Sequence, residues 1–156
     1  MMTKSISDQE LTDKAIRFCN YRPRCSNEVF LKLKSLGAND NTASKITSRL
    51  AKAKIFDDEY FATAFAEGKV RNNKWGRIKI QFELRNKGIE EPIIKKAINS
   101  IDEDEYLETI IKVAKIKLNE IKENDKRLKF RKAMQYLANK GYENNIVINV
   151  LNDILD

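Results

Sequence analysis

Histidine is absent from this 156-residue chain, and cysteine, proline and glycine are scarce, with two, two and five copies. Without histidine, the chain lacks the usual general base and the usual partner of a serine or cysteine nucleophile. Cys19 and Cys25 have no further cysteine or histidine with which to complete a zinc site. A glycine-rich phosphate loop is missing as well. The composition therefore predicts a protein that is not an enzyme and that needs no cofactor or metal.

Long apolar runs are also missing. No stretch of about 18 apolar residues occurs, which argues against a transmembrane helix. The N-terminal sequence MMTKSISDQELTDK lacks the apolar centre of a secretory signal. Because the two cysteines then favour a reducing compartment, we expect a cytoplasmic protein with no membrane partner.

The scarcity of proline and glycine leaves few points at which a helix would be interrupted, as expected of an all-helical chain. Hydrophobic residues make up 42% of the chain and charged residues 34%, a balance that indicates a folded protein with long solvated helix faces. A chain of this length can bury a sizeable core, as one domain or as a short array.

An apolar pattern recurs three times around the glycines at positions 37, 88 and 141, which are 51 and 53 residues apart. Each copy has an apolar residue four positions before its glycine and six, nine and thirteen positions after it. These residues are Leu33, Ala43, Ile46 and Leu50, then Leu84, Ile94, Ala97 and Ile101, then Leu137, Val147, Val150 and Ile154. A period of about 50 residues accommodates one unit of helix, helix, glycine turn and helix. We therefore predict an all-α, elongated tandem array of three three-helix, helix-turn-helix-like repeats, over residues 1–55, 56–101 and 102–156.

The segment from Ile78 to Leu84 can be interpreted in two ways. Its apolar residues alternate with polar ones, which is typical of a half-buried strand. The equivalent segment of the third unit, residues 130–137, has its apolar residues at helical spacing. Because equivalent segments of a repeat should share their secondary structure, we predict a helix, with Ile80 and Leu84 on its inner face.

Positive charge is concentrated in the middle of the chain. The formal net charge is +7, and residues 69–96 carry nine lysines and arginines against three glutamates. Such a surplus attracts polyanions, in practice nucleic acid or an acidic protein surface. Solvated helix faces that only keep the protein soluble are the simpler explanation, but the concentration in one repeat favours a binding face.

Six residues of this region are candidates for contact with a partner or with DNA: Arg71, Lys74, Trp75, Arg77, Lys79 and Lys87. Trp75 is flanked by cations and could stack on a base while they hold phosphates. Alternatively, Trp75 packs between helices. Lys87 precedes a turn glycine and could instead satisfy the last carbonyls of a helix. Arg71 and Lys74 lie in a predicted turn, where packing explains them less easily.

An acid-rich segment, FDDEYFA at residues 56–62, precedes the basic turn. After the turn come Gly76, Ile80, Leu84, Lys87, Gly88 and Ile89, and the first unit contributes Glu28, Lys32, Leu33 and Gly37. In type and spacing this combination resembles the RecX family of bacterial regulators of the RecA recombinase. The chain departs from the family pattern at Cys25 and Val29, where the family usually has serine and leucine.

The resemblance implies a fold of tandem three-helix repeats, in agreement with the periodicity. It also implies a regulatory protein that binds RecA nucleoprotein filaments and modulates, in the inhibitory direction, their ATPase, strand-exchange and SOS co-protease activities. Family members also bind DNA, single- or double-stranded, and have no catalytic residues. Because each predicted unit is self-contained, we expect a monomer.

Two other functions remain open. Three-helix units with a turn resemble helix-turn-helix domains, so a stand-alone DNA-binding module without recombinase dependence is the main alternative. A helical scaffold whose charge only keeps it soluble is the other. The central motif together with the threefold repeat favours the filament regulator, whereas charge alone does not separate the three.

Overall fold

The computed structural model describes residues 5–156. Residues 1–4 lie outside the described residues. They belong to the predicted first unit and to the N-terminal stretch that was predicted not to be a secretory signal. The described residues form nine α-helices and one π-helical turn, η1. They are α1 Asp8–Tyr21, α2 Ser26–Ser35, α3 Asp40–Lys52, α4 Asp58–Gly68, η1 Lys69–Asn73, α5 Arg77–Asn86, α6 Glu91–Asn99, α7 Glu103–Glu120, α8 Lys126–Asn139 and α9 Asn144–Leu155. No strand occurs between residues 5 and 156, and the all-α prediction is confirmed.

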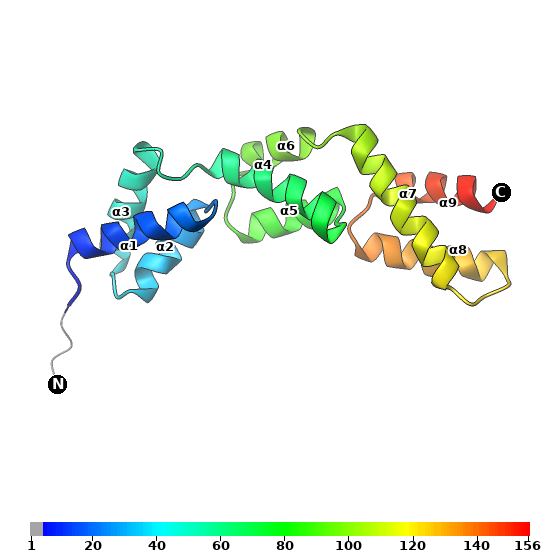
Figure 1. The fold of residues 1–156 in the computed structure, drawn as a ribbon, viewed down its shortest axis with the longest axis horizontal. Coiled ribbons are helices and arrows are strands. Elements are labelled where there is room, and N and C mark those ends of the chain that lie inside the picture. Colours follow the sequence, from blue (N-terminus) through cyan, green and yellow to red (C-terminus); the bar gives the residue numbers. More distant parts are fainter. Residues whose placement is uncertain (1–4) are drawn as a thin grey trace.

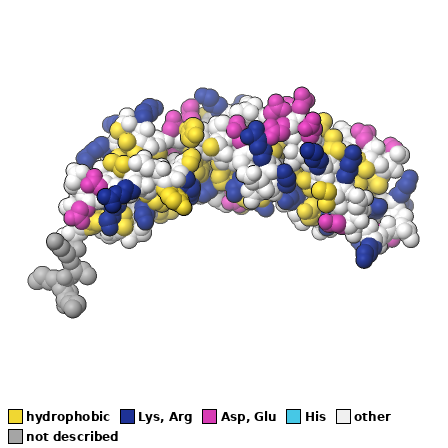
Figure 2. Space-filling view, viewed as in Figure 1, with side chains coloured by type: hydrophobic (Ala, Val, Ile, Leu, Met, Phe, Trp, Pro, Cys, Tyr) yellow, Lys and Arg dark blue, Asp and Glu magenta, His cyan; other side chains and the backbone are white. Residues whose placement is uncertain are grey.

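Three groups of three helices follow one another along the long axis of the molecule (Figure 1). The outline is a shallow arch, and α5 and α8 lie toward its concave lower edge (Figures 1 and 2). The elongated array of three-helix repeats is therefore confirmed. The predicted unit boundaries after residues 55 and 101 fall in the α3–α4 and α6–α7 connections, and as domain boundaries they stay a prediction.

Local signals in the sequence start and end these helices. The Ser7 hydroxyl accepts a hydrogen bond from the Glu10 N–H at 3.2 Å, and the Asn39 side chain accepts one from the Thr42 N–H at 2.8 Å. Both interactions satisfy N–H groups that a first helical turn leaves unpaired. The three repeat glycines have positive φ angles of 103°, 77° and 94° (Gly37, Gly88 and Gly141). Each follows the second helix of its unit, in the left-handed conformation that commonly ends a helix.

The segment with two interpretations forms most of α5, so the helix prediction is confirmed. Ile80 and Leu84 are fully buried, whereas Ile78 and Phe82 are 53% and 59% exposed. On a helix, residues four positions apart share a face. The alternation in the sequence therefore reflects two neighbouring apolar stripes, of which only one faces the core.

The apolar residues gather into two hydrophobic cores. The first unit has its own, extending from Leu11 to Phe56. The second core runs without a break from Phe61 to Leu151, through the second and third units, and takes in Cys25 from the first. The second and third units are thus joined through shared apolar packing.

Polar contacts tie the first unit to the second. The Ser26 N–H and hydroxyl donate to the Asp58 carboxylate at 2.7 and 2.9 Å. Cys25 is fully buried and its thiol lies 3.9 Å from the Lys87 carbonyl oxygen. The N-terminus of α2 therefore lies against the start of α4 and the α5–α6 turn.

Backbone contacts hold the third unit against the second. The Gly76 N–H donates to the Lys140 carbonyl at 2.7 Å, and the Ile78 N–H donates to the Gly141 carbonyl at 3.0 Å. A Cβ atom on Gly76 would lie 2.2 Å from the Gly141 carbonyl carbon. The N-terminus of α5 thus docks on the α8–α9 turn at backbone-to-backbone distance.

Candidate functional site

Three lysine side chains lie over a row of aromatic rings on the second unit. We call this group the lysine–aromatic cluster: Phe61, Phe65, Trp75, Lys69, Lys79 and Lys87. The Lys69 and Lys79 ammonium groups lie 4.8 and 4.6 Å from the centre of the Trp75 ring. Lys87 Nζ lies 5.8 and 5.7 Å from the centres of the Phe61 and Phe65 rings. These distances are within the range of cation–π attraction.

Three consecutive elements place the cluster. Phe61 and Phe65 lie one turn apart on α4, with ring centres 5.8 Å apart, and Lys69 follows one further turn along in η1. Lys79 lies on α5 and Lys87 at its C-cap, eight residues later. Because eight residues make slightly more than two helical turns, the two lysines project from the same side of α5.

The cluster carries positive charge with no acid paired to it. Within residues 5–156, no carboxylate lies within ion-pair distance of Lys69, Lys79 or Lys87, and all three side chains are half-buried. Lys140 adds a further cation. Its pKa is lowered mainly by burial and also by repulsion from Lys79 and Lys74. A group of close, unneutralised cations favours an anionic partner, because that partner relieves their mutual repulsion.

Arg71 and Arg77, two of the predicted contact residues, form ion pairs within the protein. Arg71 Nε lies 2.5 Å from Glu105 Oε1, and this hydrogen bond raises the pKa of Arg71. The Arg77 guanidinium contacts Glu103 at 2.7 Å and Glu143 at 3.0 Å, and its side chain is only 13% exposed. Both arginines therefore connect the second unit to the third, and contact with a partner stays a prediction for them.

The other predicted residues take different positions. Trp75 packs edge-on against Phe65 with ring centres 6.3 Å apart, and it keeps part of its surface exposed. The Lys74 ammonium donates to the Arg71 carbonyl at 2.5 Å. Lys87 satisfies a helical carbonyl through its backbone N–H, which donates to Glu83, while its side chain lies over the rings. Direct contact with a partner or with DNA stays a prediction for all three.

Sequence reasoning missed two parts of this site. Phe61, Phe65 and Lys69 are four residues apart, a spacing from which a shared helix face could have been inferred. The second part is the junction where the buried Tyr106 hydroxyl donates to Glu143 and accepts the Arg77 N–H at 3.0 Å. These residues are 29 to 66 positions apart from Arg77, and no local pattern connects them.

Several kinds of site are not found among the described residues. Between residues 5 and 156, no three His, Cys, Asp or Glu side chains lie close enough together to hold a metal ion. Over the same range, no helix has the length and apolar character that crossing a bilayer requires. The fold and the cluster together define a helical-repeat protein with a cationic surface over aromatic rings.

Comparison with known proteins narrows this class to a family. Family models described as the second and third three-helix domains of RecX match residues 57–98 and 103–151. A regulatory protein RecX of Clostridium tetani is 32% identical over 143 residues, which cover 90% of this chain and 65% of the relative. The regulatory protein RecX of Clostridium acetobutylicum is 30% identical over 145 residues, which cover 90% of this chain and 67% of the relative.

A solved structure shows the same fold. The crystal structure of RecX from Lactobacillus salivarius superimposes with a TM-score of 0.84, over 94% of this chain and 95% of that one, at 23% identity. The chain belongs to the RecX family. Membership of this family, whose curated relatives are named regulatory proteins, supports a regulatory role.

Proposed function

We propose that this chain binds RecA nucleoprotein filaments and modulates them in the inhibitory direction, acting on their ATPase, strand-exchange and SOS co-protease activities. It acts by binding and not by catalysis. Membership of the RecX family is the observation that supports this proposal most directly. The lysine–aromatic cluster supports a contact with acidic protein surface or nucleic-acid phosphate, because its three ammonium groups have no acid partner among residues 5–156.

The shape of the molecule suits a repetitive partner. The three units follow one another in an arch, so equivalent faces recur along its length (Figure 1). A protein of this form can contact several subunits of a polymer together. Such a ligand changes the polymer's conformation only if it binds one state more tightly than the other. We infer that it prefers the filament state in which ATP hydrolysis is slow.

Within the proposed surface, the candidate residues have different roles. Lys69, Lys79 and Lys87 supply positive charge with no ion pair among residues 5–156, and Trp75 lies under two of them. Arg71 and Arg77 set the angle between the second and third units through their acid partners. The first group should govern affinity and the second group the shape of the surface.

The exposed face of α5 does not favour a stand-alone DNA-binding module. In a helix-turn-helix domain the second helix reads bases with polar side chains such as Arg, Asn and Gln. Here the exposed face of α5 carries Ile78 and Phe82 in its N-terminal half and Asn86 at its C-terminal end, and Arg85 is paired with Glu91. This alternative is nonetheless a distinct outcome of the experiment below.

The proposal is tested by adding the protein to RecA that is hydrolysing ATP on single-stranded DNA at physiological salt. We compare the wild type with the double variant K79E/K87E and with a control, K45E/K95E, which reverses two exposed lysines with no ion pair among residues 5–156. We expect the wild type and the control to suppress hydrolysis below one protein per RecA. K79E/K87E should need at least about tenfold more protein, because hydrogen bonds to charged groups contribute roughly 1.5–3 kcal/mol each.

The other outcomes are equally informative. Tight binding to DNA alone, with hydrolysis unaffected, would replace the filament regulator by the stand-alone DNA-binding module. Equal suppression by K79E/K87E and the wild type would preserve the regulator and remove the lysine–aromatic cluster from the contact surface. Circular dichroism establishes that each variant is folded before it is assayed.

A further inference from the structure

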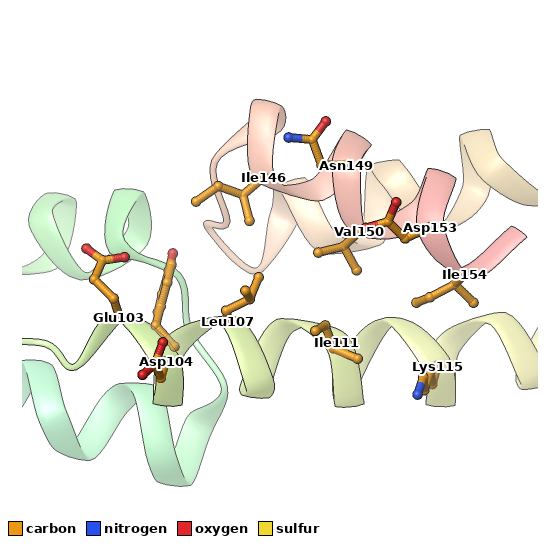
Figure 3. Close-up of a pocket in the computed structure, with 11 residues that line it drawn as sticks. Glu103, Asp104, Leu107, Ile111, Lys115, Ile146, Asn149, Val150, Asp153 and Ile154 are labelled. Atoms are coloured by element: carbon orange, nitrogen blue, oxygen red, sulfur yellow. The ribbon is translucent and has the colours of Figure 1, made fainter. Parts of the chain in front are cut away.

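An open groove lies between α7 and α9 of the third unit, with a volume of about 750 Å³. Figure 3 shows Leu107 and Ile111 of α7 directed toward Ile146, Val150 and Ile154 of α9. Leu107 is 44% exposed, and Ile111, Ile146 and Ile154 are half-buried. The two helices thus leave apolar surface between them that neither covers.

The walls of this groove determine what can fill it. Beyond the first turn of each helix, the backbone N–H and C=O groups of both walls are paired within α7 and α9, so an extended peptide would find few backbone partners there. A helix satisfies its own backbone and needs only side-chain contacts. From Glu103 to Lys115 the groove follows thirteen residues of α7, whose ends lie about 18 Å apart, which matches some three turns of helix.

The rim of the groove is acidic, although the chain as a whole has a net charge of +7. Glu103 and Asp104 line one end of it, and Asp153 lies toward the other end, which Lys115 also lines (Figure 3). Glu103 already pairs with Arg77. Asp104 and Asp153 are exposed and have no ion-pair partner among residues 5–156. Figure 2 shows acidic side chains gathered on the convex edge, near the start of α7. This charge is complementary to a basic ligand and repels an acidic one.

We propose that the α7–α9 groove binds an amphipathic helix of a partner protein, with aliphatic anchors on its buried face and lysine or arginine along its edge. The aliphatic side chains fill the space between Leu107 and Val150, and the basic ones meet Asp104 and Asp153. This site shares no residue with the lysine–aromatic cluster. The groove favours a basic partner, whereas the lysine–aromatic cluster favours an anionic one. The proposal for the groove does not depend on the binding of RecA filaments.

Two synthetic peptides of about 16 residues, long enough to form a helix, test the proposal. Both carry leucines at positions i, i+3, i+4 and i+7, and their remaining positions are rich in lysine in one and in glutamate in the other. Fluorescence anisotropy with the full chain measures their affinities at physiological salt. We expect the lysine peptide to bind at least about tenfold more tightly than the glutamate peptide.

Three variants locate the binding. L107S should weaken binding of the lysine peptide, and it should leave the fold intact because Leu107 is largely at the surface. D104K/D153K should reverse the preference between the two peptides. D13K/E120K changes two exposed acids away from the groove by the same total charge and should bind as the wild type does. Thermal melting followed by circular dichroism checks each variant.

Three results would overturn the proposal. One is equal affinity for the two peptides. Another is an equal loss of lysine-peptide binding in D104K/D153K and D13K/E120K, which would show attraction to net charge without a site. The third is self-association of the wild type that L107S abolishes, since the occupant would then be a second copy of this chain.

Discussion

Gly76 shows what a single missing side chain does in this protein. Its φ of −86° is ordinary for any residue, so the backbone conformation does not require glycine. Space requires it, because the Gly141 carbonyl occupies the place that a Cβ atom would take. Gly88 is the opposite case, with a φ of 77° and only ordinary contacts around its hypothetical Cβ.

The crowding around Gly76 is tested by a pair of glycine-to-alanine substitutions, one at Gly76 and one at Gly68, where there is space for a methyl group. Gly76→Ala should lower the free energy of unfolding by ~2 kcal/mol or more, since the added methyl group displaces the backbone of the third unit. Gly68→Ala should leave stability unchanged or raise it by up to about 1 kcal/mol, because Gly68 is helical and its Cβ would have 4.0 Å of space. Urea denaturation measures both. Equal effects would contradict the close approach of Gly76 to Gly141.

Glu28 couples the stability of the first unit to pH. Burial by itself would raise the pKa of Glu28, but the hydrogen bond from Arg22 and the nearby positive charges outweigh it and hold the pKa below 4.5. Arg22 Nη2 lies 2.8 Å from Glu28 Oε2. A carboxylate with a lowered pKa in the folded state stabilises the fold above its unfolded-state pKa. That contribution is lost as the pH falls through the folded-state value.

We therefore expect Glu28→Gln to be less stable than the wild type at pH 7, with the difference shrinking as the pH falls below about 4.5. Urea unfolding at a series of pH values measures the difference. A gap between the two proteins that stayed constant down to pH 3 would show that the charge of Glu28 contributes nothing.

Among the helices, the second one of the first and of the second unit begins at a junction with the following unit. Cys25 and Gly76 both stand twelve residues before their turn glycine, and both lie in a junction with the next unit. Lys129 occupies this position in the third unit, inside α8, which begins at Lys126 and therefore extends further toward its N-terminus. A small residue at this position permits close docking, and lysine does not.

The junction of α5, α7 and α9 depends on the Tyr106 hydroxyl. It accepts the Arg77 N–H and donates to Glu143 at a site where Tyr106 is 1% exposed. Tyr106→Phe should cost ~1–3 kcal/mol, because it leaves buried polar groups without a partner. Tyr60→Phe, at a residue that is 66% exposed, should change stability by less than about 0.5 kcal/mol. Thermal denaturation compares them, and similar melting temperatures would contradict this role.

At the scale of the whole molecule, the two cores predict two stability units. The first unit packs around Leu33 in a core of its own, and the second and third units share one that includes Leu137. Leu33→Ala should cost ~2–5 kcal/mol and lower amide protection in residues 8–52. Protection in residues 103–155 should be retained. Native-state hydrogen exchange measures both regions.

Leu137→Ala is the matched control, since both leucines are fully buried and stand four residues before a turn glycine. It should lower protection from α4 through α9 and spare α1–α3. If Leu33→Ala lowered protection equally in all nine helices, the molecule would unfold as a single cooperative unit and the division into two cores would have no energetic meaning.

Much of the fold could be predicted from the sequence because its signals are local or periodic. The glycine period and the apolar residues around it predicted three-helix repeats. The caps at Ser7 and Asn39 likewise involve contacts only three residues apart. Taken alone, the alternation of apolar and polar residues from Ile78 to Leu84 indicates a strand. Comparison with the equivalent segment of the third unit predicted the helix that is found. For the site, the sequence identified a basic region, and its role as a contact surface stays a prediction.

The helices and turns within each unit follow from the sequence alone, since helix periodicity, caps and left-handed glycines act over a few residues. The folded chain was needed to see which lysines lie over Trp75, which arginines are paired with acids, and where α7 and α9 leave a groove. The lysines over Trp75 are only four and six positions from it, and the turn between η1 and α5 brings them onto its ring. The ion pairs of Arg77, in contrast, join residues 26 and 66 positions apart. Side chains so far apart meet only when separate units dock, and docking is decided by the fit of whole surfaces.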